Sequence, residues 1–93
     1  MAADLNEKTL RYKRLLNEAI ADVRKVSVND ARLDSLADEY LTMAKSYYSD
    51  GVHFLENNDP VNALVCFSYG HAWLDAGVRL GVFQTTKKEL FAA

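Results

Sequence analysis

The chain has 93 residues, 49% of them hydrophobic, and a formal net charge of −2, values that suit one small globular domain and exclude a disordered or collagen-like chain. With 11 basic against 13 acidic side chains, it lacks the strongly basic surface that draws a protein to nucleic acid or to an anionic membrane. One proline and four glycines leave few chain breaks, which disfavours a turn-rich β-sandwich and favours helices.

The first predicted helix covers residues 4–26. Asp4 followed by Glu7 is typical of a capping box, in which the side chains bond free backbone N–H groups at the start of a helix. Apolar and small residues then recur every three, four or seven positions, which places them along one side of a helix. They are Leu5, Tyr12, Leu16, Ala19, Val23 and Val26. The turn-forming segment 27–30 ends this pattern.

The second predicted helix covers residues 32–57 and carries most of the negative charge. Residues 31–59 contain two basic and six acidic side chains, a sum of −4. The simplest interpretation is an acidic face in contact with water, and the alternative is a docking face for a basic partner. Gly51 lies inside this helix, where glycine costs about 1 kcal/mol relative to alanine. A close contact with a neighbouring helix would offset that cost.

The third predicted helix covers residues 60–82. Asp59 is a good N-cap, and Pro60 suits the first helical position because its missing N–H is not needed there. So short a turn predicts an antiparallel hairpin with the second helix. The expected fold class is all-α, an antiparallel up-down-up three-helix bundle over residues 1–83. Residues 84–93 have no clear pattern and would form a C-terminal tail that frays or adds a short extra turn.

The helix 60–82 is apolar on more than one side, whereas most surface helices show a single apolar stripe. Two partner helices cover about two of its sides, and monomers seldom expose large apolar patches. We therefore expect a non-enzymatic interaction or adaptor module, which docks a protein partner or a second copy of itself in a homodimer. The candidate interaction residues are Trp73, Leu80, Tyr69 and Phe83.

A narrow polar stripe runs along the same helix and consists of Ser68, His71, Asp75 and Arg79. Asp75 and Arg79 are four residues apart, so the simplest interpretation is an ion pair on the helix surface. The alternative is a small-ligand-binding or weakly catalytic protein centred on His71, Asp75 and Arg79. Neither a second acid–base group nor a nucleophile is placed near them by the sequence, so no catalytic residue is assigned.

No cofactor or metal ion is expected. The sequence has no glycine-rich phosphate loop, no Cys-x-x-Cys and no His-x-x-x-His pair. Its single cysteine, Cys66, excludes an intrachain disulfide and suits a reducing compartment. The first 14 residues are charged and resemble no secretory signal. Because charged side chains interrupt the apolar stretch 61–83, we predict no membrane span. With the single cysteine, the expected location is the cytoplasm.

Two runs of residues carry a family resemblance. The first extends from His53 to Ala63 and includes His53-Phe54-Leu55-Glu56 and Asp59-Pro60, and the second is Trp73-Leu74-Asp75-Ala76-Gly77-Val78-Arg79-Leu80-Gly81. Together with Ala44 to Tyr48 and Phe67 to His71, they resemble the archaeal domain-of-unknown-function family 357. The resemblance implies a three-helix bundle like a spectrin repeat or an albumin-binding domain, in a cytoplasmic archaeal protein. The family has no assigned activity, so the resemblance implies no catalytic residues.

Overall fold

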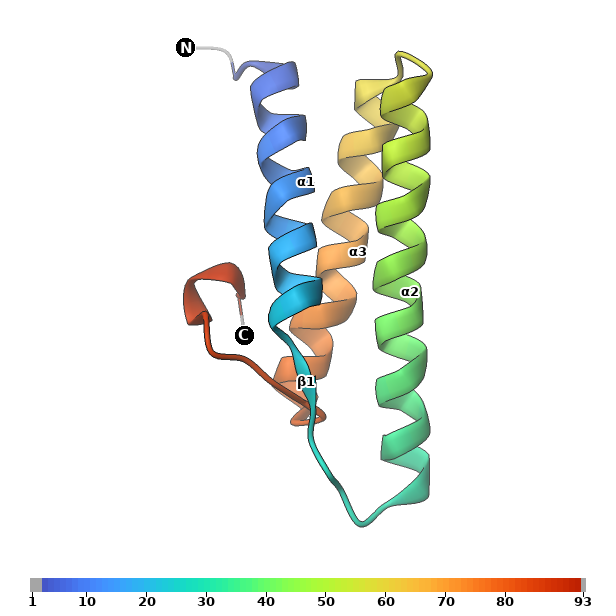
Figure 1. Cartoon of the computed structure of the whole chain (residues 1–93), viewed down its shortest axis with the longest axis vertical. Coiled ribbons are helices and arrows are strands. Elements are labelled where there is room, and N and C mark those ends of the chain that lie inside the picture. Colours follow the sequence, from blue (N-terminus) through green and yellow to red (C-terminus); the bar gives the residue numbers. More distant parts are fainter. Residues whose placement is uncertain (1–2, 93) are drawn as a thin grey trace.

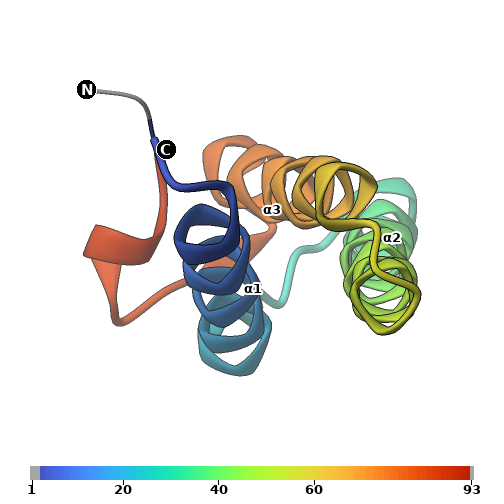
Figure 2. The ribbon, with the colours of Figure 1, turned by 90° about the horizontal axis from the view of Figure 1, so that it is seen from above.

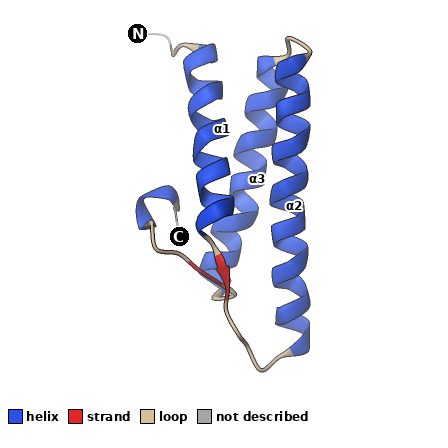
Figure 3. Ribbon diagram, viewed as in Figure 1, coloured by secondary structure: helices blue, strands red, loops and turns tan. Residues whose placement is uncertain are grey.

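Three α-helices follow one another along the chain, and each runs antiparallel to the one before it (Figure 1). The structure is a computed structural model that describes residues 3–92. The helices are α1 (Leu5–Asp22), α2 (Ala31–Glu56) and α3 (Pro60–Leu80). Two short strands, β1 (Arg24–Lys25) and β2 (Phe83–Gln84), and a 3-10 turn, η1 (Lys88–Leu90), complete it (Figure 3). The predicted all-α, up-down-up three-helix bundle is confirmed.

An aspartate begins each helix. The side chain of Asp4 accepts from the backbone N–H of Glu7 at 3.0 Å, and Asp59 accepts from that of Asn62 at 3.1 Å. Asp30 accepts from the N–H groups of residues 32 and 33 at 2.9 and 3.1 Å. These bonds satisfy N–H groups that have no partner inside the helix. The predicted N-cap Asp59 and first-turn Pro60 are both confirmed.

The predicted end of the first helix was wrong. The sequence pattern extended that helix to residue 26, whereas α1 ends at Asp22 and the next residues are extended. Arg24 and Lys25 pair in antiparallel register with Gln84 and Phe83, and the N–H of Val26 donates to the carbonyl of residue 82 at 2.8 Å. Pairing with a segment nearly sixty residues away therefore overrides the local helical pattern. The spacing of Val23 and Val26 carries no information about this distant partner.

The middle helix of the fold is α3. Seen from above, it adjoins both α1 and α2 (Figure 2), and α1 and α2 contact each other far less than either contacts α3. The largest fully buried side chains include Phe67 and Leu74 of α3 and Leu16 of α1. Because α3 packs on two neighbours, two of its sides must be apolar, and this accounts for much of the apolar surplus in its sequence.

The close approach of α2 and α3 depends on Gly51. A Cβ atom at this position would overlap the ring of Phe67, which is fully buried. The absence of a side chain therefore lets the Phe67 ring lie directly against the α2 backbone. This is the close helix contact that the position of Gly51 predicted.

Residues 85–92 follow β2 and lie beside α1, on the side away from α2 (Figures 1 and 2). The carboxylate of Asp22 accepts from the backbone N–H of Thr86 at 3.1 Å and of Lys87 at 3.3 Å, and from the hydroxyls of Thr85 and Thr86. The side chain of Leu90 is buried against the core. The C-terminal segment is thus held by side chains of the bundle, and the sequence showed no pattern for these contacts.

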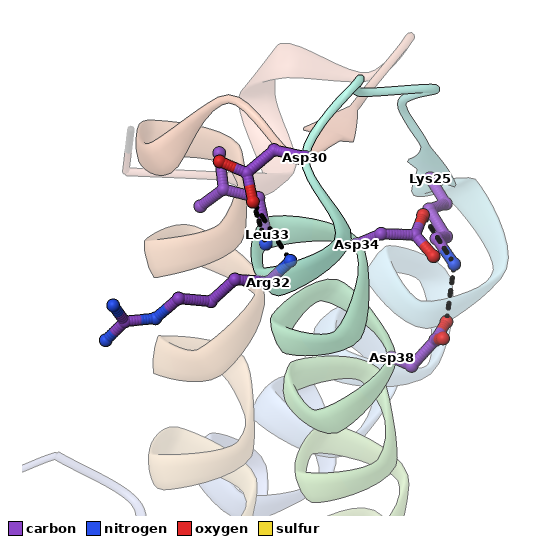
Figure 4. A network of polar contacts seen from close by, with 6 residues as sticks. All are labelled: Lys25, Asp30, Arg32, Leu33, Asp34 and Asp38. Carbon is purple, nitrogen blue, oxygen red and sulfur yellow. Dashed lines mark hydrogen bonds and ion pairs between the residues drawn. The ribbon is translucent and has the colours of Figure 1, made fainter.

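The loop between α1 and α2 is tied to α2 by Lys25. Its ammonium group lies 3.0 Å from carboxylate oxygens of both Asp34 and Asp38 (Figure 4). The hydrogen bond to Asp34 makes the largest contribution to a raised pKa of Lys25, and the hydrogen bond to Asp38 makes the next largest. Part of the negative charge predicted on α2 is therefore neutralised within the chain.

Substitution of Gly51 by alanine tests the contact between α2 and α3. Overpacking a core typically costs about 1–3 kcal/mol, and the better helix propensity of alanine returns about 1 kcal/mol. We expect Gly51→Ala to lower the free energy of unfolding, measured by urea denaturation, and Ser49→Ala at an exposed site of α2 to leave it unchanged or raise it. A Gly51→Ala protein more stable than the parent would contradict the contact.

Acid should release the C-terminal segment from Asp22. Hydrogen bonds from the Thr85 and Thr86 hydroxyls, with smaller contributions from backbone N–H groups, lower the pKa of Asp22 from 3.8 to about 2. Because the folded state binds this proton more weakly, the stabilisation is present above about pH 4 and is lost as pH falls through about 2. We expect the carboxyl resonance of Asp22 to titrate near that value in NMR spectra.

The Asp22→Asn variant gives the matching test at neutral pH. We expect faster hydrogen exchange at the amides of Thr86 and Lys87, while the amides in the middle of α3 keep their protection. Unchanged exchange at both amides would show that the carboxylate does not hold the segment.

Candidate functional site

The side of α3 that faces water is mostly apolar. Its exposed positions recur at spacings of three and four residues, so they form one continuous face. Its four large side chains are well exposed: Val61 at 58%, Val65 at 57%, Tyr69 at 55% and Leu80 at 46%. We call this surface the outer face of α3 and define it by Val61, Val65, Tyr69, Ala72, Ala76 and Leu80. The polar residues exposed beside it are Asn62, Ser68 and Arg79.

Aromatic side chains extend the outer face onto α2. The Tyr69 ring contacts Tyr47 edge-on, with ring centroids 4.9 Å apart, and Trp73 contacts Tyr40 in the same way at 5.2 Å. Beside Trp73 is a shallow hollow of about 620 Å³. Its lining residues are Leu36, Asp38, Glu39, Tyr40, Thr42, Met43 and Trp73. Aromatic and methionine side chains that remain partly exposed, as these do, are enriched where proteins bind one another.

Three of the four candidate interaction residues lie on this surface. Tyr69 and Leu80 are exposed, and Trp73 is half-buried between α3 and α2. The fourth, Phe83, is not available to a partner because it is only 4% exposed. Its ring lies against the backbone at Gly77, where a Cβ atom would overlap it. The chain turns back after α3, and this places Phe83 in β2 rather than on the outer face.

Val61 and Val65 belong to the outer face but were not among the candidates. They precede Tyr69 by eight and four residues, so the four-residue spacing already placed all three on one side of the helix. The signal was present in the sequence. Only the packing of α1 and α2 against α3 shows that this side of the helix, rather than the adjacent apolar side, faces water.

The polar stripe is divided between the C-terminal segment and water. His71 Nε2 donates to the carbonyl of Leu90 at 2.5 Å, and the carboxylate of Asp75 accepts from the N–H of Ala92 at 2.9 Å. Ser68 and Arg79 are exposed. Within residues 3–92, Asp75 forms no ion pair with Arg79, so the pair expected from their spacing was wrong.

The comparisons with known proteins agree on the family. The model of the family described as Protein of unknown function (DUF357) matches residues 11–83. The chain belongs to this archaeal family. A crystal structure of a DUF357 protein from Archaeoglobus fulgidus is similar, with a TM-score of 0.71 and 24% identity over 88% of this chain and 93% of that one. This similarity supports the three-helix fold. No curated protein matches the chain.

The cysteine of this DUF357 protein lies away from the surface. Cys66 is buried, and burial raises the pKa of its thiol, with smaller contributions from the negative charges of Asp50 and Asp59. A raised pKa reduces the thiolate fraction, which is the reactive form.

Neither a metal site nor a membrane span is found in the part of the chain that the structure describes. No three His, Cys, Asp or Glu side chains in residues 3–92 come together in a way that could bind a metal ion. Within the same range, every helix is too short or too polar to cross a bilayer.

Alanine substitutions at Phe83 and Leu80 distinguish the buried from the exposed apolar groups. We expect Phe83→Ala to lower the free energy of unfolding by about 3 kcal/mol, because it removes a buried ring and leaves a cavity. Leu80→Ala, at an exposed site, should change it by less than about 1 kcal/mol. Thermal denaturation followed by circular dichroism measures both, and equal losses would show that the two sites are not separated in this way.

Proposed function

We propose that this protein is a non-enzymatic interaction module that binds a protein, either a partner or a second copy of itself, through the outer face of α3. The observation that supports this most strongly is the exposure of four large apolar side chains, Val61, Val65, Tyr69 and Leu80, on one side of one helix. Large apolar patches on a protein surface are typical of binding sites. The adjoining Tyr47 and Trp73 add the aromatic anchors that contribute most to binding in protein interfaces.

A role as an enzyme has less support. His71 and Asp75 are the polar groups from which a small-ligand or catalytic site would be built, and both are hydrogen-bonded to the C-terminal segment. The nearby hollow of about 350 Å³ is lined partly by that same segment, at residues 89–92. A ligand would have to compete with the protein's own backbone for these groups.

Charge favours a protein as the occupant over a nucleic acid. The aromatic residues that could stack on bases lie next to α2, whose charged side chains are mostly acidic. Surfaces that bind single-stranded nucleic acid combine stacking aromatics with a positively charged groove. A single buried cysteine, which has no partner for an intrachain disulfide, further suits a module that works in the cytoplasm.

Two variants with matched exposure test this proposal. Val65 on the outer face and Leu10 on α1 are each 57% exposed, so we expect serine at either position to change the free energy of unfolding to a similar extent. We expect the double variant Val65→Ser/Tyr69→Ser to lose association by tenfold or more in affinity, equivalent to at least about 1.4 kcal/mol. Leu10→Ser should associate as the parent does. Sedimentation velocity, and affinity capture with the purified chain as bait, measure self-association and partner binding respectively.

Unchanged association and capture in the double variant would contradict the proposal. The proposal would fail equally if Leu10→Ser weakened binding as much, because the outer face would then have no special role.

A further inference from the structure

We propose that the groove between α1 and α3 is a peptide-binding site and that the C-terminal segment, residues 85–92, is its built-in occupant. The segment opens as a unit while the three helices stay folded, and an extended segment of another protein then takes its place. The groove contains no residue that defines the outer face, so this inference goes beyond the proposed function and does not rest on it. Its walls are Tyr12 and Leu15 of α1 and Ser68, His71 and Asp75 of α3.

Side chains of the bundle, rather than its backbone, hold the C-terminal segment. The backbone pairing of β2 with β1 ends at Gln84. Among the described residues, no backbone group of 85–92 bonds to the backbone of a helix or of β1. The hydrogen bonds that join the segment to the bundle all involve the side chain of Asp22, His71 or Asp75. Opening therefore breaks no backbone hydrogen bond of the bundle, and segments attached in this way open at a lower free energy than the core.

His71 and Asp75 bind the segment by its backbone. His71 Nε2 donates to the carbonyl of Leu90 at 2.5 Å, and the carboxylate of Asp75 accepts from the N–H of Ala92 at 2.9 Å. These groups belong to the two peptide bonds that flank Phe91, which is extended with φ −128° and ψ 146°. Any extended peptide offers a carbonyl and an N–H at this spacing. The pair of side chains therefore recognises backbone and not one particular sequence.

Leu90 and Phe91 supply the apolar contacts in the groove. The side chain of Leu90 is only 8% exposed and packs against the core. The ring of Phe91 lies against that of His71, with ring centroids 5.9 Å apart. An adjacent pair of apolar residues is therefore the side-chain pattern that the groove selects, with the first residue buried and the second against the histidine.

Asp22 adds a preference for hydroxyl residues. Its carboxylate accepts from the hydroxyls of Thr85 and Thr86, which precede Leu90 and Phe91 by five positions each. The partner that fits this site therefore carries an extended segment in which hydroxyl residues are followed, five positions later, by two apolar residues. In such recognition, bonds to the backbone supply affinity and contacts with side chains supply specificity.

A peptide added in trans tests the site. In the parent chain the attached segment has an effective concentration on the order of millimolar, so it competes strongly with a free peptide. Leu90→Asp places a charge at the buried position and should open the groove. We expect a labelled peptide with the sequence of residues 84–92 to bind the whole chain carrying Leu90→Asp about tenfold or more tightly than it binds the parent, measured by fluorescence anisotropy.

The same peptide with aspartate in place of its leucine is the control, and it should bind neither chain. Equal affinity of the unmodified peptide for the two chains, or no binding to the Leu90→Asp chain, would overturn the proposal.

Further substitutions in the Leu90→Asp background test the two residues that bind backbone. We expect His71→Ala and Asp75→Ala each to weaken peptide binding about tenfold, because each removes a hydrogen bond to the peptide. His53→Ala, at the chain's other histidine on α2, should leave binding unchanged. Equal effects of the two histidine substitutions would contradict the assigned site.

The outer face supplies a second comparison in the same background. Val65→Ser/Tyr69→Ser should leave peptide binding unchanged, because neither residue lines the groove. A loss of peptide binding in that variant would place the peptide on the outer face. Such a result would overturn this inference and leave the proposed function intact.

Hydrogen exchange tests whether the segment opens as a unit, and it does not depend on the folding of the Leu90→Asp chain. Asp22 holds one end of the segment and Asp75 holds the N–H of Ala92 at the other. We expect Asp22→Asn in the otherwise unchanged chain to speed exchange at the amide of Ala92 about tenfold. Glu56→Gln, at an exposed acidic residue of α2, should have no effect there. Unchanged exchange at Ala92 in Asp22→Asn would overturn opening as a unit.

Discussion

The contact between Phe67 and the backbone of α2 at Gly51 is the constraint on which the rest of the fold depends. Because the ring occupies the space that a side chain at residue 51 would fill, α2 and α3 approach closely at this point. Phe67 and Leu74 are then fully buried, and α3 can pack against α1 on a further side. The result is a small bundle organised around one central helix, with two sides of that helix covered by the other two.

The C-terminal segment follows α3 and could pack on its exposed side, but it packs elsewhere. Residues 85–92 could cover only one further part of the surface, and they lie beside α1, bonded to Asp22, His71 and Asp75. The more polar side of α3 is therefore the one that the chain covers itself. The outer face, with Val65 and Tyr69 more than half exposed, stays in water although its burial would be more favourable. This contrast supports an external protein as its occupant.

Local signals in the sequence were enough for the helices and their order. Aspartates at the helix starts, apolar periodicity and Asp59-Pro60 depend on neighbouring residues only, and the structure bears them out. The end of α1 could not be predicted, because Arg24 and Lys25 become extended by pairing with a strand that follows α3. The same distant pairing buries Phe83, which the helical pattern had placed on the surface.

The candidate site could also be predicted only in part, because it too depends on contacts between residues that are far apart in the sequence. Periodicity showed that α3 has more apolar sides than two neighbours can cover, and it identified Tyr69, Trp73 and Leu80. It could not show which side remains in water, so Val61 and Val65 were missed. The roles of His71 and Asp75 were also hidden, because their partners are backbone atoms of residues 90 and 92, and backbone groups leave no signature in a sequence.

The fluorescence of Trp73 tests the central claim, that a bound protein covers the outer face of α3, most directly. It is the chain's single tryptophan, and it is half-buried at the boundary of α2 and α3, next in sequence to the exposed Ala72 of the outer face. Quenching by acrylamide should therefore become weaker when a captured partner protein is added or, for self-association, as the protein concentration rises, and the Val65→Ser/Tyr69→Ser variant should show no such change. A quenching constant of the parent chain that is the same at every concentration and is unchanged by the captured protein would contradict the account.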